Sequence, residues 1–258
     1  MKNEKVTKSG TPFIIIGVVF VAVLIVGWYW LSTSKTTTPK TNTNTANAAK
    51  TPGIPANAPL GAQPPNQAGS PTASVTIEEF ADFQCGSCAA ANPVMSEIKS
   101  MYGSRIRFIF RNYPLSIPAH DKSYDAAVAA EAAGMQSPNK FWEMQNLLFS
   151  NQQAWTANPN FKQIWNEYAQ KIGLDVAKFQ ADAAGLGAKG RVDADIARGR
   201  ALNVNSTPTI YINGISIPYT EMKVESLKRM IDAEIQKAVP ASQPAAAKPE
   251  ANTSTTNK

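Results

Sequence analysis

One short stretch decides the fold of this chain: Phe83-Gln84-Cys85-Gly86-Ser87-Cys88. It contains both cysteines of the 258-residue protein, separated by two residues. The apolar run 75–83 before it predicts a buried strand, and the run 87–102 after it has apolar residues at helical spacing. Free N–H groups and the helix dipole stabilise a thiolate at the start of a helix. A thiol pair at this junction therefore predicts a redox site.

The two thiols are expected to have different roles. Cys85 would be the attacking thiol, and Cys88, one turn further along, the more buried resolving thiol. Two other uses of the pair stay open. Structural zinc takes four Cys or His ligands, and the chain has two cysteines and one histidine, so a zinc site needs carboxylates or a second chain. An inert local disulfide is the other, and the position at a helix start argues against it.

The charge of the chain excludes one class of partner. Its net charge of +6 is spread along the sequence and forms no basic block interleaved with aromatic residues. We therefore expect no binding of nucleic acid. With only two cysteines there is also no disulfide framework to hold a core together.

The N-terminal segment predicts a membrane anchor. Residues 1–12 are basic, and residues 13–31 are uncharged and apolar, with aromatic residues near the far end. As a helix, residues 13–31 are about 28 Å long, close to the thickness of a bilayer core. The preceding lysines place the N-terminus in the cytoplasm and the rest of the chain outside. A cleaved signal peptide is the alternative, although its apolar region is usually shorter and a small-x-small cleavage site should follow closely.

Two segments have compositions typical of disorder. Residues 32–71 are mostly Thr, Asn, Ala, Pro, Gly and Gln, and residues 239–258 are mostly Ala, Pro, Thr, Asn and Lys. Neither segment buries enough apolar surface to offset the entropy lost on ordering. We predict a disordered tether between the anchor and the domain, and a disordered C-terminal tail.

Residues 72–238 predict one folded domain. Strands at 75–83 and 105–111 are followed by a long block with helical periodicity, an insertion at about 120–202. In this block Asp175 is expected to cap a helix, and a last helix is expected over 192–202. Residues 209–217 predict a hairpin around Asn213-Gly214, and 221–237 predicts a closing helix. The expected fold class is α/β, with a mixed sheet and a helical insertion.

Three motifs together resemble the DsbA-like branch of the thioredoxin superfamily, a group of extracytoplasmic thiol-disulfide oxidoreductases. The first motif runs from Ile77 to Cys88. The second comprises Tyr113-Pro114-Leu115 with His120 and the alanine-rich stretch after it, and the third runs from Asn205 to Gly214. A Cys-x-x-Cys motif alone is weak, but a Thr-Pro strand start beyond a helical block makes the match specific. The resemblance covers about residues 73–238 and implies a thioredoxin fold with an inserted helical domain.

The resemblance implies roles for further residues. Pro208 resembles the cis-proline that faces the cysteine pair, so Thr207 and Pro208 are candidates for contact with an extended substrate. An ordinary trans-proline at a strand edge is the alternative. Glu79 has the position of a buried acid that relays the proton of the resolving cysteine, with Arg107 as a candidate partner; exposure to solvent is its alternative. His120 is expected to anchor its loop rather than to catalyse.

Gly86 and Ser87, between the cysteines, are expected to tune the redox potential. Strongly oxidising relatives have a histidine there, whereas Ser87 offers only a neutral hydrogen bond. We expect the pKa of Cys85 to be lowered to between ~7, as in thioredoxin, and ~3.5, as in DsbA.

The resemblance implies a monomeric enzyme without a cofactor or metal that introduces disulfides into reduced or unfolded secreted or envelope proteins. The catalytic domain would lie outside the cytoplasm, in the periplasm or cell envelope. A membrane redox partner, either a quinone-linked oxidase or a thiol reductant, would renew it. A disulfide reductase or isomerase is the alternative within this class. A thioredoxin-fold binding module or metallochaperone is the alternative outside it.

Overall fold

The computed structural model describes residues 53–238. The predicted cytoplasmic N-terminus, membrane anchor and C-terminal tail lie outside these residues. Among the helices of the described part, none has the length and apolar character needed to cross a bilayer.

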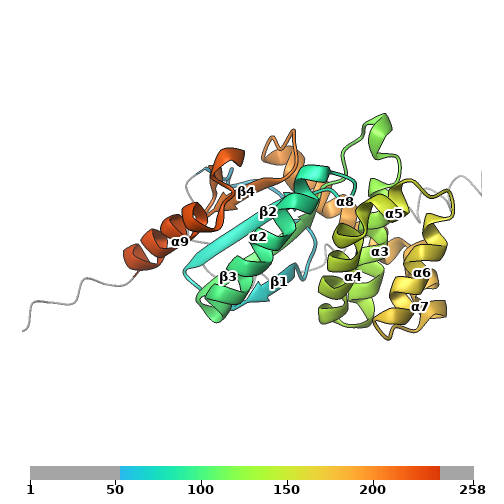
Figure 1. Cartoon of the computed structure of the whole chain (residues 1–258). Coiled ribbons are helices and arrows are strands. Elements are labelled where there is room, and N and C mark those ends of the chain that lie inside the picture. The colour runs from blue at the N-terminus through green and yellow to red at the C-terminus, as the bar shows by residue number, and fades with distance from the viewer. Residues whose placement is uncertain (1–52, 239–258) are drawn as a thin grey trace, which may run out of the picture. The chain divides into compact units, whose positions relative to one another are not determined.

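A five-stranded mixed sheet forms the centre of the domain (Figure 1). Its strands lie in the order β1-β3-β2-β4-β5; β2 and β3 run parallel, and the other pairs are antiparallel. Because β2 is a central strand, its residues are buried on both faces. The strands are β1 (Asn66–Gly69), β2 (Val75–Ala81), β3 (Ile106–Asn112), β4 (Thr209–Ile212) and β5 (Ile215–Ile217).

Helices cover both faces of the sheet. α2 (Gly86–Tyr102) and α9 (Val224–Ala238) bury apolar side chains on one face, together with the apolar residues of β2 and β4 that point to it. α8 (Leu186–Ala201) lies on the other face, against Phe80 and Tyr113. A Cβ at Gly199 of α8 would lie 2.4 Å from the Tyr113 ring, so this close packing requires glycine.

The predicted helical insertion stands beside the sheet, on the right of Figure 1. Asp175 caps α7 as expected, and its carboxylate accepts a bond from the N–H of Lys178 at 2.9 Å. α8 begins at Leu186, earlier than the predicted start at 192. The prediction missed its first turns because Gly187 and Gly190 have low helix propensity. The other helices are α3 (Ser123–Gln136), α4 (Pro138–Ser150), α5 (Gln152–Thr156), α6 (Phe161–Lys171) and α7 (Val176–Ala184).

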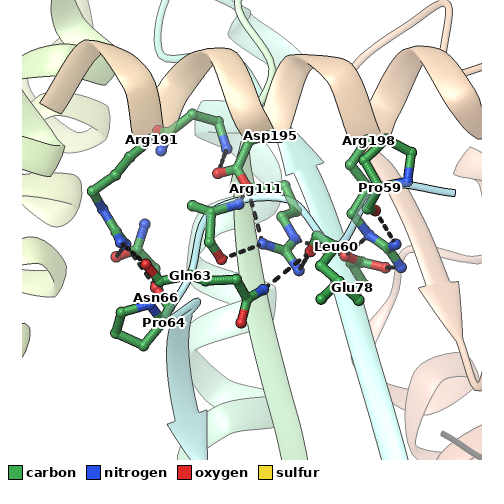
Figure 2. Close-up of polar contacts among 12 residues, drawn as sticks. Pro59, Leu60, Gln63, Pro64, Asn66, Glu78, Arg111, Arg191, Asp195 and Arg198 are labelled. Carbon is green, nitrogen blue, oxygen red and sulfur yellow. Dashed lines mark hydrogen bonds and ion pairs between the residues drawn. The ribbon is translucent and has the colours of Figure 1, made fainter. Parts of the chain in front are cut away.

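The prediction of a disordered tether is wrong for its C-terminal end. Residues 66–69 form β1, which pairs antiparallel with β3. Residues 53–65, here called the N-terminal strap, lie against the face of the sheet that α8 covers (Figure 2). Arginine side chains hold the strap by donating to its main-chain carbonyl groups, a form of binding that composition does not reveal. Arg111 donates to Leu60 and Ala62, Arg198 to Pro59, and Arg191 to Gln63 and Pro64.

A cluster of buried charged side chains lies beneath the strap (Figure 2). Arg111 donates to Glu78 at 2.7 Å and to Asp195 at 2.9 Å. Arg198 donates to both carboxylate oxygens of Glu78, at 2.6 and 2.7 Å. Burial raises the pKa of Glu78, but the contacts with Arg198 and Arg111 outweigh this effect, and the net pKa is lowered. The cluster therefore holds paired charges between the sheet, α8 and the strap.

Candidate active site

The cysteine pair lies where the C-terminal end of β2 leads into α2. Cys85 is the N-cap of α2 and is half-buried, whereas Cys88 has no exposed surface. Both are free thiols, so the structure shows the reduced form. The N–H groups of Cys88 and Ala89 donate to the Cys85 carbonyl, each at 3.1 Å, and close the first turn. The structure thus places the two thiols at the helix start that the sequence indicated.

The two thiols differ strongly in acidity. The neighbouring Cys88 thiol contributes most to lowering the pKa of Cys85, against the opposing effect of partial burial. The Thr207 hydroxyl and the N–H groups of Cys88 and Ser87 lower it further, to about 5. Burial, followed by the proximity of Cys85, raises the pKa of Cys88. At neutral pH Cys85 is therefore a thiolate and Cys88 a thiol. The Cys85 value lies within the interval expected from the sequence.

The loop before β4 faces the cysteine pair. The Thr207–Pro208 peptide bond is cis, which the resemblance had implied. The Cys85 sulfur lies 3.3 Å from the Thr207 carbonyl oxygen, to which it donates only when it is protonated. The Thr207 hydroxyl is buried without a hydrogen-bond partner among the described residues, and it lowers the pKa of both cysteines. It is therefore free to donate to a thiolate.

Glu79 is buried in β2 with 2% of its surface exposed, so the solvent-facing alternative is wrong. Burial raises its pKa to about 7, and Lys99 of α2 opposes this only in part. Burial in turn lowers the pKa of Lys99. The Lys99 ammonium lies 4.3 Å from the centroid of the Trp142 ring. Arg107 does not pair with Glu79 but donates to a glutamine of β1.

Asp82, three residues before Cys85, is a site residue that the sequence analysis missed. It is fully buried, and its N–H donates to the Cys88 sulfur at 3.5 Å. Through its carboxylate it ties the turn before the cysteines to the loop before α3, and His120 anchors that loop as expected. The carboxylate accepts from Gln84 N at 2.7 Å, Leu115 N at 2.8 Å and Ser123 Oγ at 2.5 Å, and it contacts His120 Nδ1 at 2.6 Å.

Gln152 of α5 is a second residue that sequence reasoning missed. Its side-chain amide donates to the carbonyl groups of Phe83 at 2.7 Å and Cys85 at 3.0 Å, so it joins the helical insertion to the active-site turn. No local pattern identifies it, because its partners are backbone atoms distant in sequence. Gly86 and Ser87 are exposed, and Ser87 acts on Cys85 through its main-chain N–H.

Within residues 53–238, no three or more His, Cys, Asp or Glu side chains converge as a metal site requires.

The chain is similar to part of several curated proteins. It is 32% identical over 148 residues to a Na⁺/H⁺ antiporter NhaA 1 of Mycolicibacterium gilvum, which covers 57% of this chain and 23% of that protein. It is 34% identical over 142 residues to a Na⁺/H⁺ antiporter NhaA 3 of Salinispora tropica, covering 55% of this chain and 20% of that protein. The chain thus spans less than a quarter of the length of these relatives.

Solved structures share the fold. The thiol-disulfide exchange protein alpha-DsbA2 from Wolbachia pipientis has a TM-score of 0.54 at 21% identity, covering 65% of this chain and 85% of that chain. Oxidised BdbD from Bacillus subtilis has a TM-score of 0.56 at 22% identity, covering 69% of this chain and 98% of that chain. A family model described as thioredoxin matches residues 63–233, which is more than half of the chain. The chain belongs to the thioredoxin family, and its fold is that of the DsbA-like proteins.

Proposed function

We propose that this protein is a thiol-disulfide oxidoreductase that introduces disulfide bonds into reduced proteins. A substrate thiolate attacks the Cys85 sulfur of the Cys85–Cys88 disulfide, forms a mixed disulfide and releases Cys88. The second substrate thiolate then attacks the substrate sulfur of the mixed disulfide and releases Cys85. The substrate loses two electrons and its two thiol protons and becomes a disulfide. The enzyme gains the two electrons; at neutral pH Cys88 takes up one proton, Cys85 stays a thiolate, and the other proton goes to solvent.

The acidity of Cys85 is the observation that carries this proposal. A thiolate stabilised in the reduced protein favours reduction of the enzyme disulfide and so makes that disulfide more oxidising. The pKa of about 5 also makes Cys85 a good leaving group, which promotes release of the oxidised substrate. Both effects favour electron flow from substrate to enzyme over the reductase or isomerase alternative.

Glu79 and Thr207 support the same reaction. When Cys88 is released as a thiolate, its raised pKa makes it take up a proton. Glu79 has a pKa of about 7 and faces α2, the helix that carries Cys88, so we assign it the relay of that proton. Thr207 and Pro208 would receive an extended substrate segment against the thiol pair.

The cellular setting belongs to this proposal as well. We propose a cytoplasmic N-terminus (1–12), a membrane anchor (13–31) and a C-terminal tail (239–258), with the folded domain in the periplasm or cell envelope. Reduced enzyme would return its two electrons to a quinone-linked membrane oxidase. The Wolbachia protein with this fold is a thiol-disulfide exchange protein, which supports this class of reaction.

The reduction potential of the cysteine pair tests the proposal. Equilibration in glutathione buffers of known potential should give a value nearer to ~−120 mV than to ~−270 mV, and a value near ~−270 mV would indicate a reductase. A second assay follows the oxidation of a reduced, unfolded protein, with Cys85→Ser as the inactive control. Faster reshuffling of mispaired disulfides than net oxidation would indicate an isomerase.

A further inference from the structure

Pro208, which follows the residue in contact with Cys85, also lines a recess next to the redox site. Its volume is about 240 Å³, and it lies between the loop before β4, the strands β4 and β5, and the short helix after β5. The reaction derived above uses none of its lining residues apart from Pro208. Those residues include Asn205, Ser206, Pro208, Thr209, Ser216 and Tyr219.

The chemistry of the recess is polar and uncharged. Its walls contain amide and hydroxyl side chains, and no charged residue is among the described residues that line it. Asn205, Ser216 and Tyr219 are exposed, and their side chains make no hydrogen bond to another described residue. These groups are therefore available both to donate and to accept bonds from a bound side chain.

The recess is lined by the two residues that flank Thr207, the residue in contact with the reacting sulfur. Thr207 contacts Cys85 through its carbonyl at 3.3 Å, and the residues on either side of it, Ser206 and Pro208, line the recess. Ser216 belongs to β5, the last strand in the order of the sheet. An extended polypeptide held at Thr207 would therefore pass the recess, where an edge strand also offers backbone groups for pairing.

Most of the recess lies on the face of the sheet opposite the α2–α9 core, although Ile217, a residue of that core, forms part of its wall. Side chains alternate along β4, so Ile210 and Ile212 point into that core, while Thr209 and Tyr211 point to the face of Phe80 and α8. Neither Glu79 nor Lys99 is among the residues that line it.

We propose that this recess is a subsite for the substrate polypeptide that takes an uncharged hydrogen-bonding residue, such as Ser, Thr, Asn or Gln, close in sequence to the reacting cysteine. This inference rests on the proposed function and names a substrate preference for it. A charged side chain in the recess would lose water without gaining an opposite charge. An amide or hydroxyl side chain would exchange its bonds to water for bonds to the protein.

Two-cysteine peptides test the subsite. They differ only in one residue, Asn, Asp or Lys, scanned through the three positions on each side of the reacting cysteine. The kcat/KM for peptide oxidation is divided by the value for dithiothreitol, with glutathione disulfide regenerating the enzyme. At one position the wild-type protein should prefer Asn over both Asp and Lys by about fivefold.

Charge variants of the recess supply the specific readout. Asn205→Asp should shift the preference at that position towards the Lys peptide, and Tyr219→Lys should shift it towards the Asp peptide. Asn205 and Tyr219 lie in different walls of the recess, before β4 and after β5. If one variant does not fold, the other still tests the subsite. Asn139→Asp is the matched control, because it makes the same change on an exposed residue of α4 outside the recess.

Each outcome is decisive. Equal ratios for the three peptides at every position in the wild-type protein would overturn the subsite, as would identical shifts in Asn205→Asp and Asn139→Asp. Normal oxidation of dithiothreitol in those cases leaves the proposed function standing. Failure of the wild-type protein to oxidise both dithiothreitol and peptide would overturn the proposed function, and the subsite with it.

Discussion

Glu78 and Glu79 are neighbours in β2, yet they lie in two regions that shift the pKa of a buried carboxyl in opposite directions. Glu78 lies in the cluster beneath the strap, where two arginines lower its pKa. Glu79 lies on the side of α2, where burial raises its pKa to about 7 and only Lys99 opposes the shift. Side chains alternate across a strand, so one step along the chain exchanges a paired environment for an apolar one. The first region holds paired charges between strands and strap, and the second holds a carboxyl whose raised pKa fits the proton relay that we propose.

Removing Arg111 should have the largest effect on stability. Arg111→Ala leaves Glu78 without one of its partners, Asp195 without its arginine and the Ala62 carbonyl without a donor, and it leaves the Leu60 carbonyl with only the Gln63 amide at 3.3 Å. We expect a loss of about 3–5 kcal/mol in the free energy of unfolding, measured by chemical denaturation. Arg229→Ala removes the exposed ion pair with Glu221 and should cost less than about 1 kcal/mol. Equal losses in the two variants would contradict the structural role of the cluster.

Glu79→Gln should change the pH dependence of stability. The folded-state pKa of about 7 exceeds the ordinary value of 4.5, so between these values the folded protein binds the extra proton. Wild-type stability should therefore fall as pH rises, and the glutamine variant should lack this slope. Between pH 5 and pH 8 we expect the free energy of unfolding of the wild-type protein to fall by about 2–3 kcal/mol more than that of the glutamine variant.

The measurement for Glu79→Gln is denaturation at several pH values in that window. Glu97→Gln serves as the control, because Glu97 is an exposed residue of α2, the helix that covers Glu79. This variant should keep the wild-type dependence of unfolding free energy on pH. A Glu79→Gln curve parallel to wild type would show that Glu79 is ionised throughout, which would also remove it as a proton relay.

Thr207→Val should make Cys85 less acidic. The variant keeps the shape of the side chain but removes the hydroxyl that lowers the Cys85 pKa. We expect an increase of about one unit, equivalent to about 1.4 kcal/mol, read from thiolate absorbance against pH in the reduced protein. Thr220→Val, at an exposed site after β5, should leave the titration unchanged. An unchanged titration in Thr207→Val would assign the acidity to the helix start and Cys88 alone.

Gln152→Ala should have the smallest effect. It removes two hydrogen bonds to the active-site turn, from a side chain that is only partly buried. We expect a loss of about 1 kcal/mol and faster alkylation of Cys85, since the turn is less constrained. Gln153→Ala changes the exposed neighbour and should alter neither quantity. Equal behaviour of both variants would mean that the helical insertion does not hold the turn.

The sequence predicted those parts of the domain that depend on local pattern. Apolar periodicity located both core strands, the hairpin and the long helices, and the Cys-x-x-Cys spacing located the thiol pair at a helix start. The strap was not predicted because its main-chain carbonyl groups are bound by arginines far away in the chain. Every residue has such a carbonyl, so the sequence does not show which ones are bound. Asp82 and Lys99 escaped for a related reason: each acts through partners that only the folded chain brings near.

The arginine contacts of the strap also constrain the order in which the domain assembles. Pro59 and Arg198 are 139 positions apart, and Ala62 and Asp195 are 133 apart. The ribosome makes the strap before α8. The contacts between the strap and α8 can therefore form only after the insertion has been synthesised. The contacts with Arg191, Asp195 and Arg198 require α8 to be in place, so we expect strap docking to be completed late in folding. A protease added during refolding should therefore cut within residues 53–65 before it cuts β2.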